Sequence, residues 1–295
     1  MNSAHRPGLK RLPCMNTAAA LKKSKTALKL PSLPNVVLKL NAMMSDPDAS
    51  VMEIGEALAG DPELSTRVLR IANSAMFGLP VPVLDPRHAA SILGLNRLHE
   101  TVLQAATTGA FGSKKNQKDP LFLEHWRHSI LVASIARDLG GHAKNEGLMP
   151  PEELHVAGLL HDAGRAVLLD NMREPYVLAL EAAAKSGAST IDAERQAFGC
   201  HHGQLGAKLV LAWGLPRSLA QTIAFHHDPW KVAKAIPSAV LVSVADRLAH
   251  AVATNDLEGM PHVACRKDLF FLGLGMGTML SVATRAIGDW RKIEL

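Results

Sequence analysis

The run GLLHDAGRAVLLD, residues 158–170, places an imidazole and a carboxylate side by side in a segment that otherwise has the composition of a protein core. Burying a lone carboxylate is costly, so Asp162 needs a positive partner or several hydrogen-bond donors. Gly158 and Gly164 flank His161 at three residues on either side, and such small neighbours indicate room for another group. The fold is therefore expected to bring polar side chains from distant parts of the chain to this pair.

Composition and helix-start signals predict an all-α fold. Alanine and leucine are abundant and aromatic residues make up only 4% of the chain, a balance that favours helices over sheets. Ser50 and Glu53 have the spacing of a capping box, and Asp61 followed by Pro62 is a typical helix start. At 295 residues the chain is long enough for about two compact domains. We therefore expect short helices packed into bundles.

Basic residues are concentrated in the N-terminal tail. Residues 1–30 hold seven of the 32 Lys and Arg residues and no acid, whereas the other 25 face 27 acidic residues. A solvated, disordered arm over residues 1–27 is favoured over contact with nucleic acid or an anionic surface. No apolar run approaches about 20 residues, so no membrane span is expected. Three cysteines without CxxC spacing indicate a reducing compartment, and we expect a cytoplasmic protein.

Several histidines fall on the inward stripes of separate predicted helices. A residue shares a helix face with residues three, four and seven positions away, so apolar neighbours at these spacings mark an inward position. His128 meets this test with Leu131 and Ile135. His125 and His142 fail it and are expected at the surface. The same reasoning, applied along the chain, selects an inward set of His128, His161, Asp162, His202, His226, His227 and Asp246.

Two arrangements would satisfy the buried aspartates. Arg165, three residues after Asp162, is placed for a purely structural ion pair with it. A divalent cation, or two cations bridged by Asp162, would instead satisfy both aspartates and use the neutral imidazoles as electron-pair donors. Mixed His and Asp ligands suit iron, manganese, nickel or zinc rather than calcium. The metal accounts for the whole set and is the favoured interpretation. Such a site would activate water and hold a phosphate.

The order of these residues resembles the ligand set H…HD…D of the HD superfamily of metal-dependent phosphohydrolases, with the further ligands of its two-metal branch. The residues that carry this resemblance are, in order, His128, His161, Asp162, His202, His226, His227 and Asp246. The segments LPSLPNVVLKLNAMMS, AGLLHDAGR, WGLP and IAFHHDP are similar to an HDOD domain, the HD-related output domain of bacterial signalling proteins. The similarity covers roughly residues 28–250.

The resemblance implies an HD-domain-like helical bundle with an N-terminal helical subdomain. We expect a basic tail at residues 1–27 and an HDOD domain at residues 28–250, followed by a helical extension at residues 251–295. Within the HDOD domain, residues 28–115 would form the N-terminal subdomain and residues 121–250 the HD-like subdomain. The polar segment GSKKNQKDP would link the two subdomains.

HDOD domains are generally regarded as signalling modules without established hydrolytic activity. The resemblance therefore implies a regulatory module that holds one or two divalent ions and acts through a signalling protein partner. The alternative is a metal-dependent phosphohydrolase or phosphodiesterase for a nucleotide or cyclic nucleotide, with Asp162 and Arg165 as catalytic residues. Arg165 stands where the cyclic-dinucleotide phosphodiesterases have lysine, and HHDPWKVA lacks their GYP segment, so hydrolysis of cyclic di-GMP is disfavoured.

Overall fold

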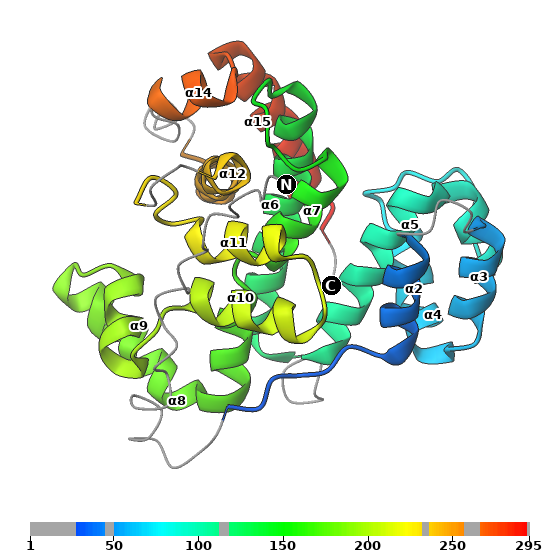
Figure 1. The fold of residues 1–295 in the computed structure, drawn as a ribbon, viewed down its shortest axis with the longest axis horizontal. Helices are drawn as coiled ribbons and strands as arrows, with labels where there is room; N and C mark the ends of the chain where they lie inside the picture. Colours follow the sequence, from blue (N-terminus) through cyan, green and yellow to red (C-terminus); the bar gives the residue numbers. More distant parts are fainter. Residues whose placement is uncertain (1–27, 45–49, 112–117, 232–235, 257–265, 294–295) are drawn as a thin grey trace, which may run out of the picture.

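The structure, a computed structural model, describes residues 28–44, 50–111, 118–231, 236–256 and 266–293. Within these residues every regular element is a helix, which confirms the expected all-α class (Figure 1). The helices are α2 (Asn35–Met44), α3 (Val51–Ala59), α4 (Pro62–Ala72), α5 (Pro86–Ala110), α6 (Pro120–His142), α7 (Pro151–Leu160), α8 (Ala163–Ser186), α9 (Thr190–Phe198), α10 (His202–Ala212), α11 (Arg217–Phe225), α12 (Pro237–Thr254), α14 (Arg266–Leu272) and α15 (Met276–Trp290).

The predicted basic arm, residues 1–27, lies outside the described residues, as does most of the polar linker, residues 112–117. The division into domains stays a prediction.

The two predicted helix starts are confirmed. Ser50 and Glu53 cap α3 reciprocally, and the Asp61 side chain accepts a hydrogen bond from the backbone N–H of Leu64 at the start of α4.

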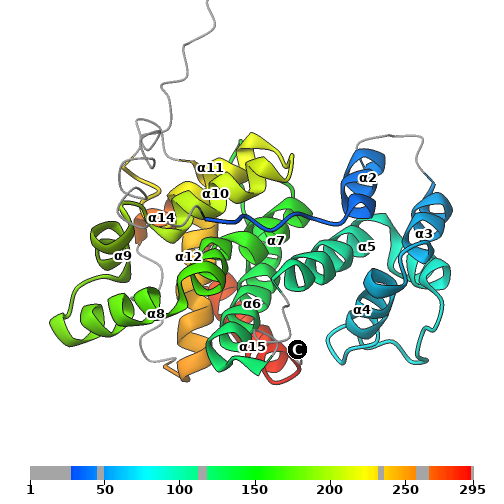
Figure 2. The ribbon, with the colours of Figure 1, turned by 90° about the horizontal axis from the view of Figure 1, so that it is seen from below.

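Helices α2, α3 and α4 pack together against α5, on the right of Figures 1 and 2. Helix α5 bends at Gly94, whose φ of 70° is a left-handed conformation that glycine adopts without strain. Beyond the bend, α5 runs toward the larger bundle and contacts α7 (Figure 2). Asn73 fixes the loop before α5, because its side chain both donates to and accepts from the backbone of Val83 at 2.7 Å. Asn73 is also the C-terminal cap of α4, so its role is structural: it ends α4 and holds the loop that follows.

Helix α6 lies at the centre of the larger bundle, where α7, α12 and α15 pack against it. Helix α10 packs between α8 and α11. The first described residues cross this bundle in an extended conformation before α2 begins, as the dark blue segment of Figure 2 shows. The indole N–H of Trp213 donates to the carbonyl of Pro31 at 2.7 Å, and Asn171 accepts from the backbone N–H of Lys29 at 2.8 Å. The chain segment that precedes α2 is therefore fastened to α8 and to the end of α10.

Polar contacts near the C-terminal end of α15 hold this helix against α6. Arg285 Nε lies 2.9 Å from a carboxylate oxygen of Asp138, and the Ser134 hydroxyl donates to Asp289 at 3.1 Å. Among the described helices, none has by itself the length and apolar character needed to cross a membrane. Helices α14 and α15 have the required length and apolar character only when they are taken together, and the chain bends by 95° between them.

Candidate metal centre

His161 and Asp162 lie at the junction between two helices. Helix α7 ends at Leu160, His161 is its C-terminal cap, and Asp162 precedes the first residue of α8. The pair is therefore not part of one continuous helix. Because the chain turns between the two residues, both side chains reach the same interior region, which an uninterrupted helix would have separated by about 100°. His161 is fully buried and Asp162 is nearly so.

The two glycines that flank this junction allow neighbouring helices to approach closely. A β-carbon on Gly158 would lie 2.7 Å from the Cα of Ala133 on α6. One on Gly164 would overlap the backbone carbonyl of His202, at the start of α10. The sequence suggested that these glycines make room for a ligand. The structure shows instead that the backbones of α6 and α10 fill that space, and the close packing holds α10 against the His161–Asp162 junction.

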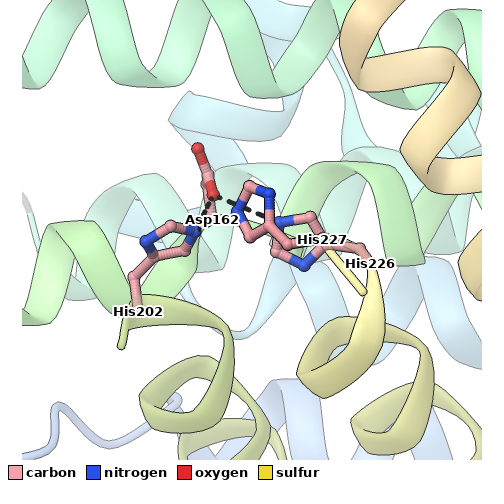
Figure 3. Close-up of side chains that lie close together, drawn as sticks. All are labelled: Asp162, His202, His226 and His227. Atoms are coloured by element: carbon pink, nitrogen blue, oxygen red, sulfur yellow. Dashed lines mark hydrogen bonds and ion pairs between the residues drawn. The ribbon is translucent and has the colours of Figure 1, made fainter. Parts of the chain in front are cut away.

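All seven residues selected from the sequence come together in the structure. His128 comes from α6, Asp246 from α12, and the others from the helix junctions around α7, α8, α10 and α11. Their nitrogen and oxygen atoms form overlapping groups in which every ligand atom lies within 4.8 Å of the others. The inner group, shown in Figure 3, consists of Asp162, His202, His226 and His227. The remaining residues of the set are His128, His161 and Asp246.

The inner group converges on one oxygen of Asp162. His202 Nε2 lies 2.9 Å from Asp162 Oδ1, and His226 Nε2 lies 3.6 Å from the same oxygen. His202 Nε2 is also only 2.7 Å from His227 Nε2 (Figure 3). Two imidazole nitrogens at this distance must share either a proton or a cation, because two lone pairs would repel each other.

The other predicted residues surround Asp246. His128 Nε2 lies 3.0 Å from Asp246 Oδ1, and His161 Nε2 lies 3.8 Å from that oxygen. His161 Nε2 is also 3.5 Å from Asp162 Oδ2, so it lies between the two carboxylates. The imidazole of His161 is thus near both aspartates without a hydrogen bond to either.

Backbone carbonyls orient two of the imidazoles. His161 Nδ1 lies 2.7 Å from the carbonyl oxygen of Gly158, and His226 Nδ1 lies 2.7 Å from that of Ile223. Because a carbonyl can only accept, each Nδ1 carries the proton and each Nε2 keeps its lone pair. Both Nε2 atoms are buried without a hydrogen-bond partner in the described part of the protein. Two electron-pair donors are therefore aimed into the pocket and lack a proton donor.

These unpartnered atoms fit a divalent transition metal. His161 Nε2, His226 Nε2 and Asp162 Oδ1 are all buried and make no hydrogen bond to described residues. Buried polar atoms normally find a partner, so three such atoms around one pocket require an explanation. Imidazole nitrogens and a carboxylate are the ligands preferred by zinc, iron, nickel and manganese. The donor set matches the metal expected from the sequence, and the identity and number of ions stay predictions.

The ionisation states of these groups also suit a cation. Burial alone would raise the pKa of Asp162, but Arg165, His161 and His202 outweigh it and hold that pKa well below the usual range. Burial likewise opposes ionisation of Asp246, yet His128 and His161 lower its pKa. Burial lowers the pKa of His161 to about 4. Near neutral pH the pocket therefore presents two carboxylates and a neutral His161.

Arg165 forms the ion pair that the sequence offered as an alternative to metal. Its Nε lies 3.0 Å from Asp162 Oδ2, whereas Oδ1 of the same carboxylate faces His202 and His226. The two oxygens of Asp162 therefore have different surroundings. The arginine is compatible with a metal because it contacts only Oδ2 and leaves Oδ1, which faces the inner imidazoles, free of the guanidinium.

Sequence reasoning missed Glu194, which supports His202 from behind. Glu194 lies on α9 and is fully buried. Its Oε2 accepts a hydrogen bond from the backbone N–H of His202 at 2.7 Å and lies 2.7 Å from His202 Nδ1. The hydroxyl of Tyr176 donates to Oε1 of the same carboxylate at 3.0 Å. A carboxylate behind a ligating histidine fixes its tautomer, so His202 Nε2 is left to face the pocket.

His250 was also missed, and His125 was misplaced. His250 Nε2 lies 3.4 Å from Asp246 Oδ1, and the spacing of four residues on one helix was the available signal. The expectation that His125 lies at the surface is wrong, since it is buried beside Phe122 and Trp126. The criterion of apolar neighbours three, four and seven residues away assumes that one face of the helix is exposed. Helix α6, which carries His125, is instead enclosed by neighbouring helices. His142, at the end of α6, is exposed as expected.

Comparison with known proteins identifies a family, a curated relative and solved structures that are similar to this chain. The sequence model of the HDOD domain family matches residues 30–229 of this chain. An uncharacterized protein of Treponema pallidum is 25% identical over 199 residues, which are 68% of this chain and 38% of that protein. This chain thus aligns with well under half the length of that curated relative.

Two solved structures share the fold. One is a candidate phosphohydrolase from Shewanella amazonensis, with a TM-score of 0.74 and 24% identity, covering 95% of this chain and 100% of that one. The other is a candidate signal transduction protein from Marinobacter aquaeolei, with a TM-score of 0.73 and 19% identity, covering 94% of this chain and 64% of that one.

Proposed function

Because this chain belongs to the HDOD family, we propose that it is a regulatory module of bacterial signal transduction whose pocket binds divalent metal. In this proposal the bound metal stabilises one arrangement of the surrounding helices, and a signalling protein partner reads that arrangement. The family resemblance supports the signalling role. The name of the similar Marinobacter aquaeolei protein, a candidate signal transduction protein, points the same way.

The observation that carries the proposal is that the Nε2 nitrogens of His161 and His226 are buried without hydrogen-bond partners among the described residues, close to His202. His161, His202 and His226 are at most 1% exposed, and they belong to different helix junctions. A cation shared by these groups would tie α7, α10 and α11 together at one point. Without it, the Nε2 lone pairs of His161 and His226 are buried with no hydrogen-bond partner among the described residues, which costs free energy. Metal occupancy is therefore expected to change how firmly these helices pack.

The helices around the pocket connect it to the outer parts of the molecule. Helix α7, which ends beside His161, also packs against α5, and α5 carries the helices α2, α3 and α4. Helix α12, which holds Asp246, packs against α14 and α15. A change in packing at the pocket can therefore reach two surfaces at which a partner could bind. Nucleotide remains a second ligand class that such a module could sense.

Phosphoester hydrolysis is the alternative function, and Arg165 is the observation that favours it. Its side chain is 27% exposed and lies beside Asp162, so its outer guanidinium nitrogens could contact a phosphate. Similarity to the Shewanella amazonensis protein, a candidate phosphohydrolase, agrees with this. When bound, a divalent metal would make water more acidic and stabilise charge on phosphate oxygens. Asp162 would then help to hold the metal, and Arg165 would orient the phosphate.

One experiment separates the two functions. The untagged chain would be purified without added metal, its metal content measured by elemental analysis, and its activity assayed on a panel of nucleotides and cyclic nucleotides. The same measurements would be made on the double variant His161→Ala/Asp162→Ala and on His142→Ala, which changes an exposed histidine. Hydrogen–deuterium exchange with added metal and with chelator would report changes in packing.

The regulatory proposal predicts bound metal, no turnover, and slower exchange in α7, α10 and α11 when metal is present. The double variant should lose both the metal and the protection, whereas His142→Ala should keep both. Turnover that disappears in the double variant but persists in His142→Ala would replace the regulatory function with the enzymatic one. Wild-type protein that binds no metal and shows no metal-dependent protection would refute both.

A further inference from the structure

Helices α14 and α15 expose large apolar side chains near the corner between them. Phe270, on α14, is 90% exposed, and Met276 and Leu280, in the first turns of α15, are 42% and 53% exposed. The backbone N–H of Gly273 donates to the carbonyl of Phe270 at 3.2 Å, which closes the turn after α14. Figure 1 shows α14 at the outer edge of the molecule. An almost fully exposed phenylalanine on this helix therefore projects into solvent.

The exposed face of α15 is distinct from the face that packs on the bundle. This helix contacts α6 and α12, and its buried residues are Met279, Val282, Ala283 and Ala286. At about 100° per residue, Met276, Leu280 and Arg291 lie within about 60° of one another around the helix axis. Single exposed leucines are normal on a protein surface, whereas three large apolar side chains within residues 270–280 form a concentration that indicates a binding surface.

The exposed charges of this part of the chain are all basic. In residues 266–293 the exposed charged side chains are Arg266, Lys267, Arg285, Arg291 and Lys292. Asp268 is buried and pairs with Arg247 at 2.6 Å. Asp289 accepts a hydrogen bond from Ser134 at 3.1 Å. Because Arg285 pairs with Asp138, four exposed cations remain beside the apolar side chains of these two helices.

The loop beside α14 does not change this balance of charge. The backbone N–H of Lys144 donates to the carbonyl of Leu272 at 2.9 Å, so the loop after α6 lies against the end of α14. Lys144 and Glu146 are both exposed, and their opposite charges offset each other. The positive charge of this surface therefore comes from α14 and α15 themselves.

We propose that α14 and α15 form a docking surface for an anionic lipid bilayer. Their three exposed apolar side chains would enter the headgroup region, and their four exposed cations would contact lipid phosphates. Exposed apolar side chains next to Lys and Arg are the combination with which peripheral proteins bind such a surface, because apolar burial and electrostatic attraction add together. A fluid bilayer also accommodates a projecting phenylalanine without a preformed pocket.

This docking surface is separate from the pocket of the proposed function and needs no metal. It lies outside residues 30–229, which the HDOD family model matches. Helix α12 packs against both α14 and α15, so the docking surface adjoins the larger bundle. Binding here would hold the module against a membrane surface, where the proposed function does not by itself place it.

The test measures how much of the untagged, full-length chain sediments with vesicles as lipid is added, in chelator so that no metal bridges protein and phosphate. Wild type should bind vesicles that contain phosphatidylglycerol and not vesicles of phosphatidylcholine alone. Phe270→Ser should bind at least about tenfold more weakly, because burial of a phenylalanine contributes roughly that factor or more. Leu178→Ser, which changes a 64% exposed residue of α8, is the matched control and should bind as wild type does.

A second pair of variants tests the charges. Arg266→Gln/Arg291→Gln removes two exposed cations of the docking surface. It should weaken binding about 20–30-fold, since each basic residue near an anionic bilayer contributes roughly a factor of five. Lys185→Gln/Arg217→Gln removes two exposed cations on α8 and α11 and should bind as wild type does. Circular dichroism would verify that every variant is folded.

Absence of wild-type binding to phosphatidylglycerol vesicles would overturn the proposal and favour an acidic protein as the partner of this surface. Binding that either Phe270→Ser or Arg266→Gln/Arg291→Gln leaves unchanged would also overturn it, because another part of the chain, such as the basic residues 1–30, would then contact the lipid. Equal weakening by both charge variants would indicate attraction without a defined site. A dimer of wild type in analytical ultracentrifugation that Phe270→Ser abolishes would assign the surface to a second copy instead.

Discussion

One carboxylate oxygen of Glu194 contacts both the side chain and the backbone of His202. Oε2 lies 2.7 Å from His202 Nδ1 and accepts a hydrogen bond from the His202 backbone N–H at 2.7 Å. This places the proton on Nδ1 and directs Nε2 toward Asp162 Oδ1, 2.9 Å away. Glu194 thereby fixes both the position and the tautomer of an inner ligand, although it does not itself face the pocket.

Replacing Glu194 is expected to weaken metal binding without replacing a ligand. Loss of such a carboxylate behind a ligating histidine typically reduces metal affinity by about 10–100-fold. Glu194→Ala should show a decrease of this size in Co²⁺ titrations, and Glu194→Gln a smaller one, because its amide oxygen can still accept from Nδ1. Equal affinities in wild type and Glu194→Ala, with both folded by circular dichroism, would show that His202 is oriented by other contacts.

Adding a methyl group at Gly164 should disturb the pocket through the backbone. A β-carbon there would overlap the His202 carbonyl, so α8 and α10 would have to separate. Overpacking of this kind usually lowers the free energy of unfolding by about 1–3 kcal/mol. Gly164→Ala should therefore melt at a lower temperature and bind Co²⁺ more weakly.

Gly141 provides the matched control, since it lies in α6 and a β-carbon there would meet nothing within 4 Å. Gly141→Ala should raise the free energy of unfolding by about 0.5–1 kcal/mol, because alanine is the better helix former. If both variants were stabilised in thermal unfolding, the close approach of α8 and α10 would be incorrect.

The inward positions of the candidate metal ligands could be predicted from the sequence because they depend on local spacing. His128 and Asp246 are marked by apolar neighbours on their own helices, and helix caps such as Asp61 need only a few adjacent residues. No comparable local pattern in the sequence identifies Glu194. It lies on a different helix from His202, and its contact depends on the direction of the chain between α9 and α10.

Packing between helices explains the other errors. The sequence shows that Gly158 is small, but only the relative placement of α6 and α7 shows that the Ala133 backbone fills the space beside it. His125 was expected to be exposed because the interpretation considered one face of α6 at a time. Its burial follows from α6 having neighbours on several sides, which is a property of the assembled bundle.

Acidification should destabilise the metal-free protein through buried neutral histidines such as His155. Burial lowers the pKa of His155 to about 3 from an ordinary value of 6.5. Above about pH 6.5 both folded and unfolded chains are neutral at this residue. As the pH falls toward 3, only the unfolded chain binds the proton, so the free energy of unfolding decreases by about 1.4 kcal/mol per pH unit.

Urea unfolding in chelator at pH 7 and pH 5 would measure this loss, to which the other buried histidines add. His155→Gln should lose less stability between these two pH values than wild type, whereas the exposed variant His142→Gln should follow wild type. A pH dependence that His155→Gln leaves unchanged would contradict the burial of a neutral imidazole at this position.

Arg165→Met should make the stability of the protein more dependent on metal. Arg165 Nε lies 3.0 Å from Asp162 Oδ2, and removing one partner of a buried ion pair costs about 3–5 kcal/mol. We expect a loss near the lower end of this range in chelator, since the arginine side chain is 27% exposed. A bound cation would offset part of that loss by supplying positive charge to the same carboxylate.

The increase in melting temperature on addition of Co²⁺ should therefore be larger for Arg165→Met than for wild type. Arg285→Met is the matched control, because it breaks a more exposed pair with Asp138, and neither residue belongs to the proposed ligand set. Surface pairs contribute at most about 1 kcal/mol, so this control should respond to Co²⁺ as wild type does. The same increase in all three proteins would mean that the charge of Asp162 is not shared between Arg165 and a metal.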